Sequence, residues 1–193
     1  MPETNLGRVR QKMSFPWLIF RASLLTPWLG YLCWSDAKHR RLPNVWTLGG
    51  LLAGLCVQAG FWGWAGFKDG LAAAGVAVLF LILPFLLRAA GAGDLKMLAA
   101  CAAFVGLRET PFLLMAVSFA GLFVAIPMLV MRKVTAARLV HILRCMFDWR
   151  YDRAAGRAAL PPKDDERVRV PFGIAIALGT WATLALEAIL LCR

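Results

Sequence analysis

Six apolar runs, each near the length that crosses a bilayer, constrain the fold of this chain more than any other feature. They are separated by short charged breaks and cover residues 15–34, 45–67, 71–87, 95–107, 112–131 and 171–191. A helix rises about 1.5 Å per residue, so a ~30 Å hydrocarbon core needs about 20 residues. Several runs are apolar on every face, whereas a helix of a soluble protein is apolar along one stripe. The pattern favours an all-α, polytopic membrane bundle of about six transmembrane helices over a soluble helical protein.

Composition and charge fit a chain whose main partner is the lipid bilayer. The 193 residues are 60% hydrophobic and 17% charged, whereas about a quarter of an average soluble domain is charged. A net charge of +11 alone would favour nucleic acid as a partner. The Lys and Arg residues, however, concentrate in the breaks between apolar runs, as expected of loops that set membrane topology. We therefore predict no nucleic-acid partner.

The distribution of positive charge also gives an orientation. A cytoplasmic loop after the first run would hold Lys38, Arg40 and Arg41, and ten more Lys and Arg lie between residues 132 and 169. The basic N-terminal arm resembles a signal peptide, but Arg21 interrupts the apolar run and no small-residue cleavage site follows. We predict a retained first span, an outside N-terminus and one membrane domain over residues 1–193.

Within that domain we expect a core over about residues 28–131, a polar cytoplasmic segment over about 132–169 and a last span over about 171–191. The polar segment is either a basic amphipathic surface helix followed by a loop, or a solvated connector that anchors the topology. The fourth run reaches span length only if it recruits residues 89–94. Gly50 and Gly54, four residues apart in the second run, would allow close helix packing.

Cysteine and histidine usage argues against a metal centre. The five cysteines form no CxxC pair and are not spaced as metal ligands; they are Cys33, Cys56, Cys101, Cys145 and Cys192. Four of them lie in or beside apolar runs, where cysteine usually serves as a small core residue. With only His39 and His141 present, zinc-hydrolase motifs such as HExxH are excluded. The sequence predicts neither a metal nor a disulfide framework.

Two of the eleven acidic residues have settings that suggest catalysis. Asp36 follows the first apolar run and Asp94 follows the third, so two spans separate them. An even number of crossings places both on the same side of the membrane. Two carboxylates held close together cannot both ionise easily and share one proton near neutral pH. One can then act as a general base on water while the other, protonated, polarises a scissile carbonyl.

The neighbours of Asp94 agree with this chemistry but also allow a simpler interpretation. Gly91 and Gly93 would let the backbone turn sharply and a substrate chain approach, and Asp94 would sit at a helix N-terminus, which favours a carboxylate. Lys96 would anchor the helix end or offset the negative charge of the pair. Taken alone, the Gly-x-Gly-Asp pattern also fits a structural interpretation, in which it forms a turn and a helix N-cap without a catalytic role. Asp36 alone is equally a topology residue paired with a nearby basic side chain.

The motifs around both aspartates resemble those of the type IV prepilin peptidase family of intramembrane aspartyl proteases. Residues 91–96 (GAGDLK) are similar to its GxGD motif, and residues 36–44 are similar to its first aspartate motif, with Arg40, Arg41, Pro43 and Asn44. Residues 169–179 (RVPFGIAIALG) resemble its C-terminal motif, with Pro171 and Gly173. The resemblance implies that Asp36 and Asp94 are the catalytic pair. Gly91, Gly93, Lys96 and the other motif residues are supporting positions.

The resemblance also implies an activity, a substrate and a location. Members remove the short basic leader from type IV prepilins and related pseudopilins at the cytoplasmic face of the bacterial inner membrane. Larger members carry an N-terminal insert with paired CxxC motifs and methylate the new N-terminus using S-adenosylmethionine. The chain has no such insert and resembles the short form that serves Flp-type pili of the tight-adherence system. We therefore assign no cofactor and no methyltransferase activity. The alternative is a non-catalytic membrane component, such as a transporter or a pilus assembly subunit, whose aspartates serve packing or ion pairing.

Overall fold

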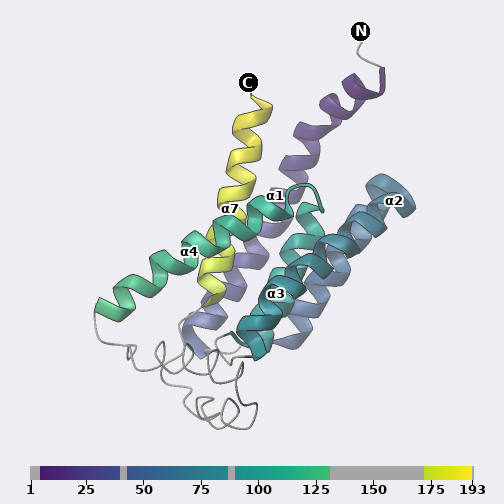
Figure 1. Ribbon diagram of the computed structural model, residues 1–193. Helices are drawn as coiled ribbons and strands as arrows, with labels where there is room; N and C mark the ends of the chain where they lie inside the picture. Colours follow the sequence, from purple (N-terminus) through teal and green to yellow (C-terminus); the bar gives the residue numbers. More distant parts are fainter. Residues whose placement is uncertain (1–4, 40–42, 87–89, 131–171, 193) are drawn as a thin grey trace, which may run out of the picture.

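The computed structural model describes residues 5–39, 43–86, 90–130 and 172–192 (Figure 1). Its helices are α1 (Asn5–His39), α2 (Asn44–Leu86), α3 (Ala92–Val105), α4 (Thr110–Val130) and α7 (Phe172–Leu191). The described ranges contain no strand, which confirms the all-α prediction. By length and composition, α2 and α7 can each cross a membrane, whereas the apolar part of α4 in these ranges is shorter. Six separate spans are therefore not established, and the predicted polar segment lies outside the described residues.

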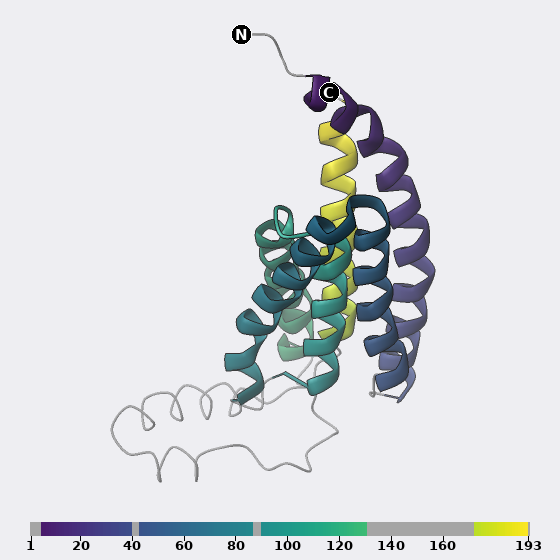
Figure 2. The ribbon, with the colours of Figure 1, turned by 90° about the vertical axis from the view of Figure 1, so that its right-hand side faces the viewer.

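Helix α2 is a hairpin of two legs, and its turn is not where the sequence predicted it. The charged break at Lys68 and Asp69 suggested a boundary between residues 67 and 71, but the helical geometry breaks at Gly63, with φ 62° and ψ −148°. A positive φ strains residues that carry a Cβ, so a glycine fixes the turn. The two legs diverge from this turn with α3 between them (Figure 2), and Leu55 of the first leg and Ala74 of the second share a core cluster with Ala99 and Ala103 of α3.

Helix α3 is too short to cross the hydrocarbon core. Its 14 residues span about 21 Å at the usual rise per residue, and it does not recruit residues 89–91 to reach span length. Its last carbonyls therefore need hydrogen-bond donors from the protein, because lipid supplies none. The Arg21 guanidinium donates to the carbonyls of Phe104 (3.3 Å) and Val105 (3.0 Å), and Gln58 donates to that of Phe104 (3.4 Å).

Arg21, which interrupts the first apolar run, lies in the interior and is only 1% exposed. It forms an ion pair with Glu187 of α7 and lies over the Trp17 ring. The sequence alone did not predict a role for Glu187. A signal was present, because Glu187 is the single acidic residue of the last apolar run and Arg21 is the single basic residue of the first. Charges inside a membrane usually pair with one another, and here the pair joins α1, α7 and the end of α3.

Most of helix α3 is buried on all sides, and small side chains let its neighbours approach it. Every residue from Met97 to Val105 is buried, and the middle of this stretch is Ala99, Ala100, Cys101, Ala102 and Ala103. Gly50 lies under the Trp28 ring and Gly54 lies against Phe104, so the close packing predicted for this glycine pair is confirmed. Many large apolar side chains of α2, α4 and α7 are exposed, with Val45 and Phe123 above 80%. Such an exterior is expected of helices that face lipid.

The helix backbones approach most closely within two units, which share one hydrophobic core with residues of all five helices described above. In the first, α3 lies against both legs of α2; in the second, α1 and α4 lie against α7. We call the boundary between α1 and the first leg of α2 the α1–α2 seam. The C-terminal end of α1, the N-terminal ends of α2, α3 and α7, and the C-terminal end of α2 all lie at one end of the bundle (Figures 1 and 2).

Candidate active site

Asp36 lies in the last turn of α1 and is held by the first turn of α7. Its side chain is 7% exposed, and its Oδ2 accepts a hydrogen bond from the backbone N–H of Gly173 (3.1 Å). The absence of a side chain at residue 173 is necessary for this contact, because a Cβ there would lie 2.7 Å from Asp36 Oδ2. The predicted C-terminal motif therefore meets the predicted first aspartate.

The environment of Asp36 favours its neutral form. Burial raises the pKa of the Asp36 carboxyl from its ordinary value, and the hydrogen bond from the Gly173 N–H lowers it in part. Asp36 lies beyond the apolar stretch of α1, near the end where the aqueous loops begin. A carboxyl with a raised pKa keeps its proton to a higher pH and can donate it during a reaction.

Asp94 occupies the third residue of α3 and is only partly buried. Its Oδ2 accepts a hydrogen bond from the backbone N–H of Gly91 (2.9 Å), which is the N-cap residue. Gly91 itself is extended, with φ −85° and ψ 156°, so it does not use the left-handed region open to glycine. The positive end of the α3 dipole lies at this carboxyl and favours its charged form.

Two supporting residues from different motifs meet beside Asp94. The Lys96 ammonium donates a hydrogen bond to the Asn44 side-chain oxygen (2.9 Å), which ties the start of α3 to the start of α2. Pro43 supports the same corner, because its carbonyl accepts hydrogen bonds from the backbone N–H groups of Trp46 (3.1 Å) and Thr47 (3.2 Å). Lys96 thus holds the starts of α2 and α3 together.

The structure brings the predicted residues to one end of the bundle but distributes them over two units. Asp36 and Gly173 belong to the unit of α1, α4 and α7. The other unit, of α2 and α3, holds Asp94 with Gly91, which caps α3, and Lys96 with Asn44. Each aspartate has its own backbone N–H donor. Three other predicted positions, Arg40, Arg41 and Pro171, lie outside the described residues.

Comparison with known proteins assigns the chain to a family. A model of the type IV leader peptidase family matches residues 23–126, which is more than half of the chain and includes both aspartates. The chain belongs to the type IV leader peptidase family. No curated protein and no solved structure matches it. The family assignment, the two long apolar helices and the apolar exterior together identify this protein as a membrane peptidase.

The match ends before α7, so two contacts of the peptidase lie outside it. These are the Gly173 N–H that holds Asp36 and the Glu187 carboxylate that pairs with Arg21. The Cys33 thiol also approaches the Gly173 carbonyl, at 3.8 Å, one turn before Asp36. Among the described residues, no group of three or more His, Cys, Asp or Glu side chains has the geometry of a metal site.

Proposed function

We propose that this membrane peptidase is an aspartic-type endopeptidase that removes the basic leader from type IV prepilins, specifically of the Flp type. The observation that carries the proposal is the presence of two carboxylates in different settings at one end of the bundle. Asp36 is buried and held by α7, whereas Asp94 is partly exposed and held by the N-terminus of its own helix. Their positions at helix ends match a bond that lies at the junction of a basic leader and an apolar helix.

The different settings of the two carboxylates support different roles in the proposed reaction. Asp94, charged, removes a proton from a water molecule, and the resulting oxygen attacks the carbonyl carbon of the scissile peptide. Asp36, neutral, donates its proton to the carbonyl oxygen as that bond becomes single. The tetrahedral intermediate then collapses, the C–N bond breaks, and Asp94 returns its proton to the leaving nitrogen. Asp36 recovers its proton from the diol, so each group ends as it began.

The proposed location is the bacterial inner membrane, with the chain crossing it several times and the aspartates on the cytoplasmic side. The basic residues that follow α1 and the ten in residues 132–169 support this side, because positive charge is retained in the cytoplasm. The bilayer and the prepilin are the proposed partners. The proposal includes no cofactor.

A cleavage assay tests the proposed function. The peptidase, reconstituted in vesicles of bacterial lipid, is incubated with a Flp-type prepilin, and the products are analysed by intact mass. We expect one cut between the basic leader and the apolar helix, and a new N-terminus with an unmodified mass in the presence of S-adenosylmethionine. A prepilin that stays intact in the presence of folded peptidase would contradict the proposed function. A methyl group added to the new N-terminus would show that the protein is also a methyltransferase, an activity that the proposal does not include.

Substitution of Gly173 by alanine is expected to lower kcat about ten- to a hundred-fold. The new Cβ would lie 2.7 Å from Asp36 Oδ2 and displace the carboxyl, and displacements of about 1 Å at a reacting group have effects of this size. The hydrogen bond that lowers the pKa of Asp36 is weakened at the same time. Since activity falls when Asp36 loses its proton, the upper limb of the pH–rate profile should move to higher pH.

The matched control for Gly173→Ala is Gly30→Ala in α1. A Cβ at residue 30 meets nothing within 4 Å, so this variant should keep the wild-type rate and pH profile. The Gly173 variant should also bind prepilin with little change in KM, because its effect is on the position of a carboxyl. An unchanged kcat and pH profile in Gly173→Ala would show that α7 does not position Asp36 for catalysis.

A further inference from the structure

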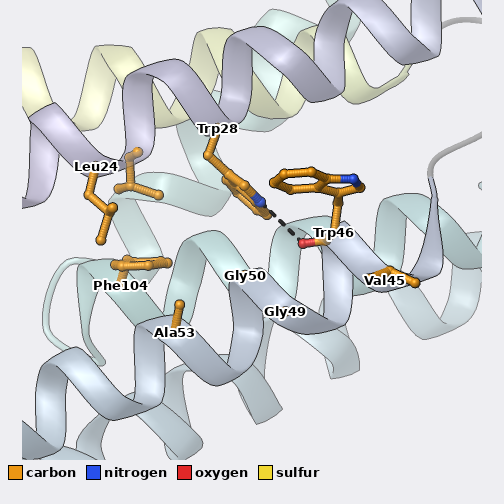
Figure 3. A pocket seen from close by; sticks show the side chains of 9 residues that line it. Leu24, Trp28, Val45, Trp46, Gly49, Gly50, Ala53 and Phe104 are labelled. Carbon is orange, nitrogen blue, oxygen red and sulfur yellow. Dashed lines mark hydrogen bonds between the residues drawn. The ribbon is translucent and has the colours of Figure 1, made fainter.

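An apolar cavity of about 340 Å³ lies in the α1–α2 seam (Figure 3). Its walls come from both packing units: α1 on one side and the first leg of α2 on the other, with one side chain of α3. The lining residues are Leu24, Leu25, Trp28, Val45, Trp46, Gly49, Gly50, Ala53 and Phe104. A volume of this size is within the range of pockets that bind ligands. It adjoins the catalytic site, because its lining residue Trp46 also donates the backbone hydrogen bond to Pro43 described above.

Glycines give one wall of the cavity an unusual form. The Trp28 ring covers Gly50 and donates a hydrogen bond from Nε1 to the carbonyl of Trp46 (3.1 Å), as Figure 3 shows. The neighbouring Gly49 is uncovered, because a Cβ built on it meets nothing within 4 Å. A helix surface without side chains lets another helix approach its backbone closely in a membrane. The cavity therefore has room beside Gly49 for an apolar group from outside the chain.

The rim of the cavity indicates its depth. Exposed aromatic side chains run from the cavity toward the end that holds Asp36: Trp46 packs on Tyr31, and Tyr31 packs on Trp34 (centroids 4.9 and 6.2 Å apart). The Lys38 ammonium lies 4.9 Å from the centre of the Trp34 ring. Trp, Tyr and Lys are typical of the membrane–water interface. These side chains favour a place near the membrane–water interface for the cavity, which reaches from Val45 at the start of α2 to Leu24, about three turns before Asp36 on α1.

We propose that the seam cavity is a docking site for the prepilin, and that it binds the apolar helix that follows the scissile bond. This inference rests on the proposed function. Asp36 and Asp94 belong to different packing units, so a bond held between them lies where the two units meet, and the cavity lies along the same boundary. Trp28 precedes Asp36 by eight residues, about 12 Å along α1. An equally long stretch of substrate helix, entering the bilayer beside α1, brings side chains about two turns after the cut to the cavity.

Substitution of Gly49 by leucine tests the inference, with Gly60→Leu as the matched control. Both glycines lie in the first leg of α2 and a Cβ on either meets nothing within 4 Å, but only Gly49 lines the cavity. For full-length prepilin in vesicles, we expect Gly49→Leu to raise KM at least about ten-fold, which is a loss of one decade in affinity. Gly60→Leu should behave as wild type. Equal KM values in the two variants would overturn the proposal.

A truncated substrate separates docking from a general defect. A peptide that carries the leader and only a few residues after the scissile bond lacks the apolar helix. Its kcat/KM should be the same for wild type, Gly49→Leu and Gly60→Leu. Equal losses on both substrates in Gly49→Leu would overturn the proposal and assign the cavity to a lipid chain or to packing. If wild type cuts neither substrate, the proposed function fails; if cutting depends on both aspartates but not on Gly49, only the docking site fails.

Photocrosslinking gives a direct second measurement. A benzoylphenylalanine is placed in the prepilin about eight residues after the scissile bond, and Asp36→Asn peptidase is used so that the substrate stays intact. Mass spectrometry of the labelled peptidase should find the adduct within residues 24–28 of α1 or 45–53 of α2, the two stretches that line the cavity. A probe moved to the leader should leave that region unlabelled. Labelling confined to α4 or α7 would overturn the docking site.

Discussion

Replacement of Asp36 or of Asp94 by asparagine is expected to lower the rate of prepilin cleavage at least about a thousand-fold. Asparagine keeps an oxygen that accepts the hydrogen bond from Gly173 or Gly91, so the local fold is retained. It cannot exchange a proton with water or with the scissile carbonyl, and general acid–base groups contribute about 10²- to 10⁴-fold each. The double variant should be no slower than either single variant, because residues that act as a unit are not additive.

Asp69→Asn is the matched control for the aspartate variants. Asp69 also accepts a hydrogen bond from a backbone N–H, that of Leu107 (3.0 Å), but it does so where α3 ends, away from the end that carries Asp36 and Asp94. This variant should cleave prepilin at the wild-type rate. Cleavage is measured by intact mass over a time course, with protein recovery and helicity compared among all variants. A rate within ten-fold of wild type for Asp36→Asn or Asp94→Asn would refute the aspartic mechanism.

Replacement of Arg21 by leucine is expected to reduce the free energy of unfolding by about 3–5 kcal/mol. The substitution removes one partner of an internal ion pair and leaves the charge of Glu187 without compensation. Breaking a buried ion pair in this way typically costs about 3–5 kcal/mol of stability. The carbonyls of Phe104 and Val105 also lose their donor at the end of α3. Equilibrium unfolding in mixed micelles, followed by circular dichroism, measures the change.

Two further variants define the cause of that loss. Arg21→Leu combined with Glu187→Leu should recover part of the stability, because no buried charge is left without a partner, although the α3 carbonyls stay unsatisfied. Arg108→Leu is the exposed control: its side chain is 91% accessible and lies 3.9 Å from Glu109, so little change is expected. If Arg21→Leu proves as stable as Arg108→Leu, the internal ion pair does not hold the bundle together.

Much of the candidate site was predictable because its motifs lie at the ends of apolar runs. Counting two crossings between Asp36 and Asp94 places them on one side, and the structure has α1 end and α3 begin at the same end of the bundle (Figure 1). The start of α3 was predictable within two residues, because Gly91 and Asp94 form a local cap whose contacts are close in sequence. The hairpin turn of α2 was misplaced, because charge suggested residues 68–69 whereas backbone geometry selects Gly63.

The sequence by itself was sufficient to predict an all-helical chain and its family, and it proposed the two aspartates, since all three depend on hydropathy and short motifs. Only the tertiary structure decided which side chains complete the site across long separations. It joined Asp36 to Gly173, 137 residues away, and Lys96 to Asn44, 52 residues away. It also placed Arg21 beside Glu187 and opened a cavity between α1 and α2. Such contacts depend on how helices pack and in which register, and neither hydropathy nor a local motif specifies that register.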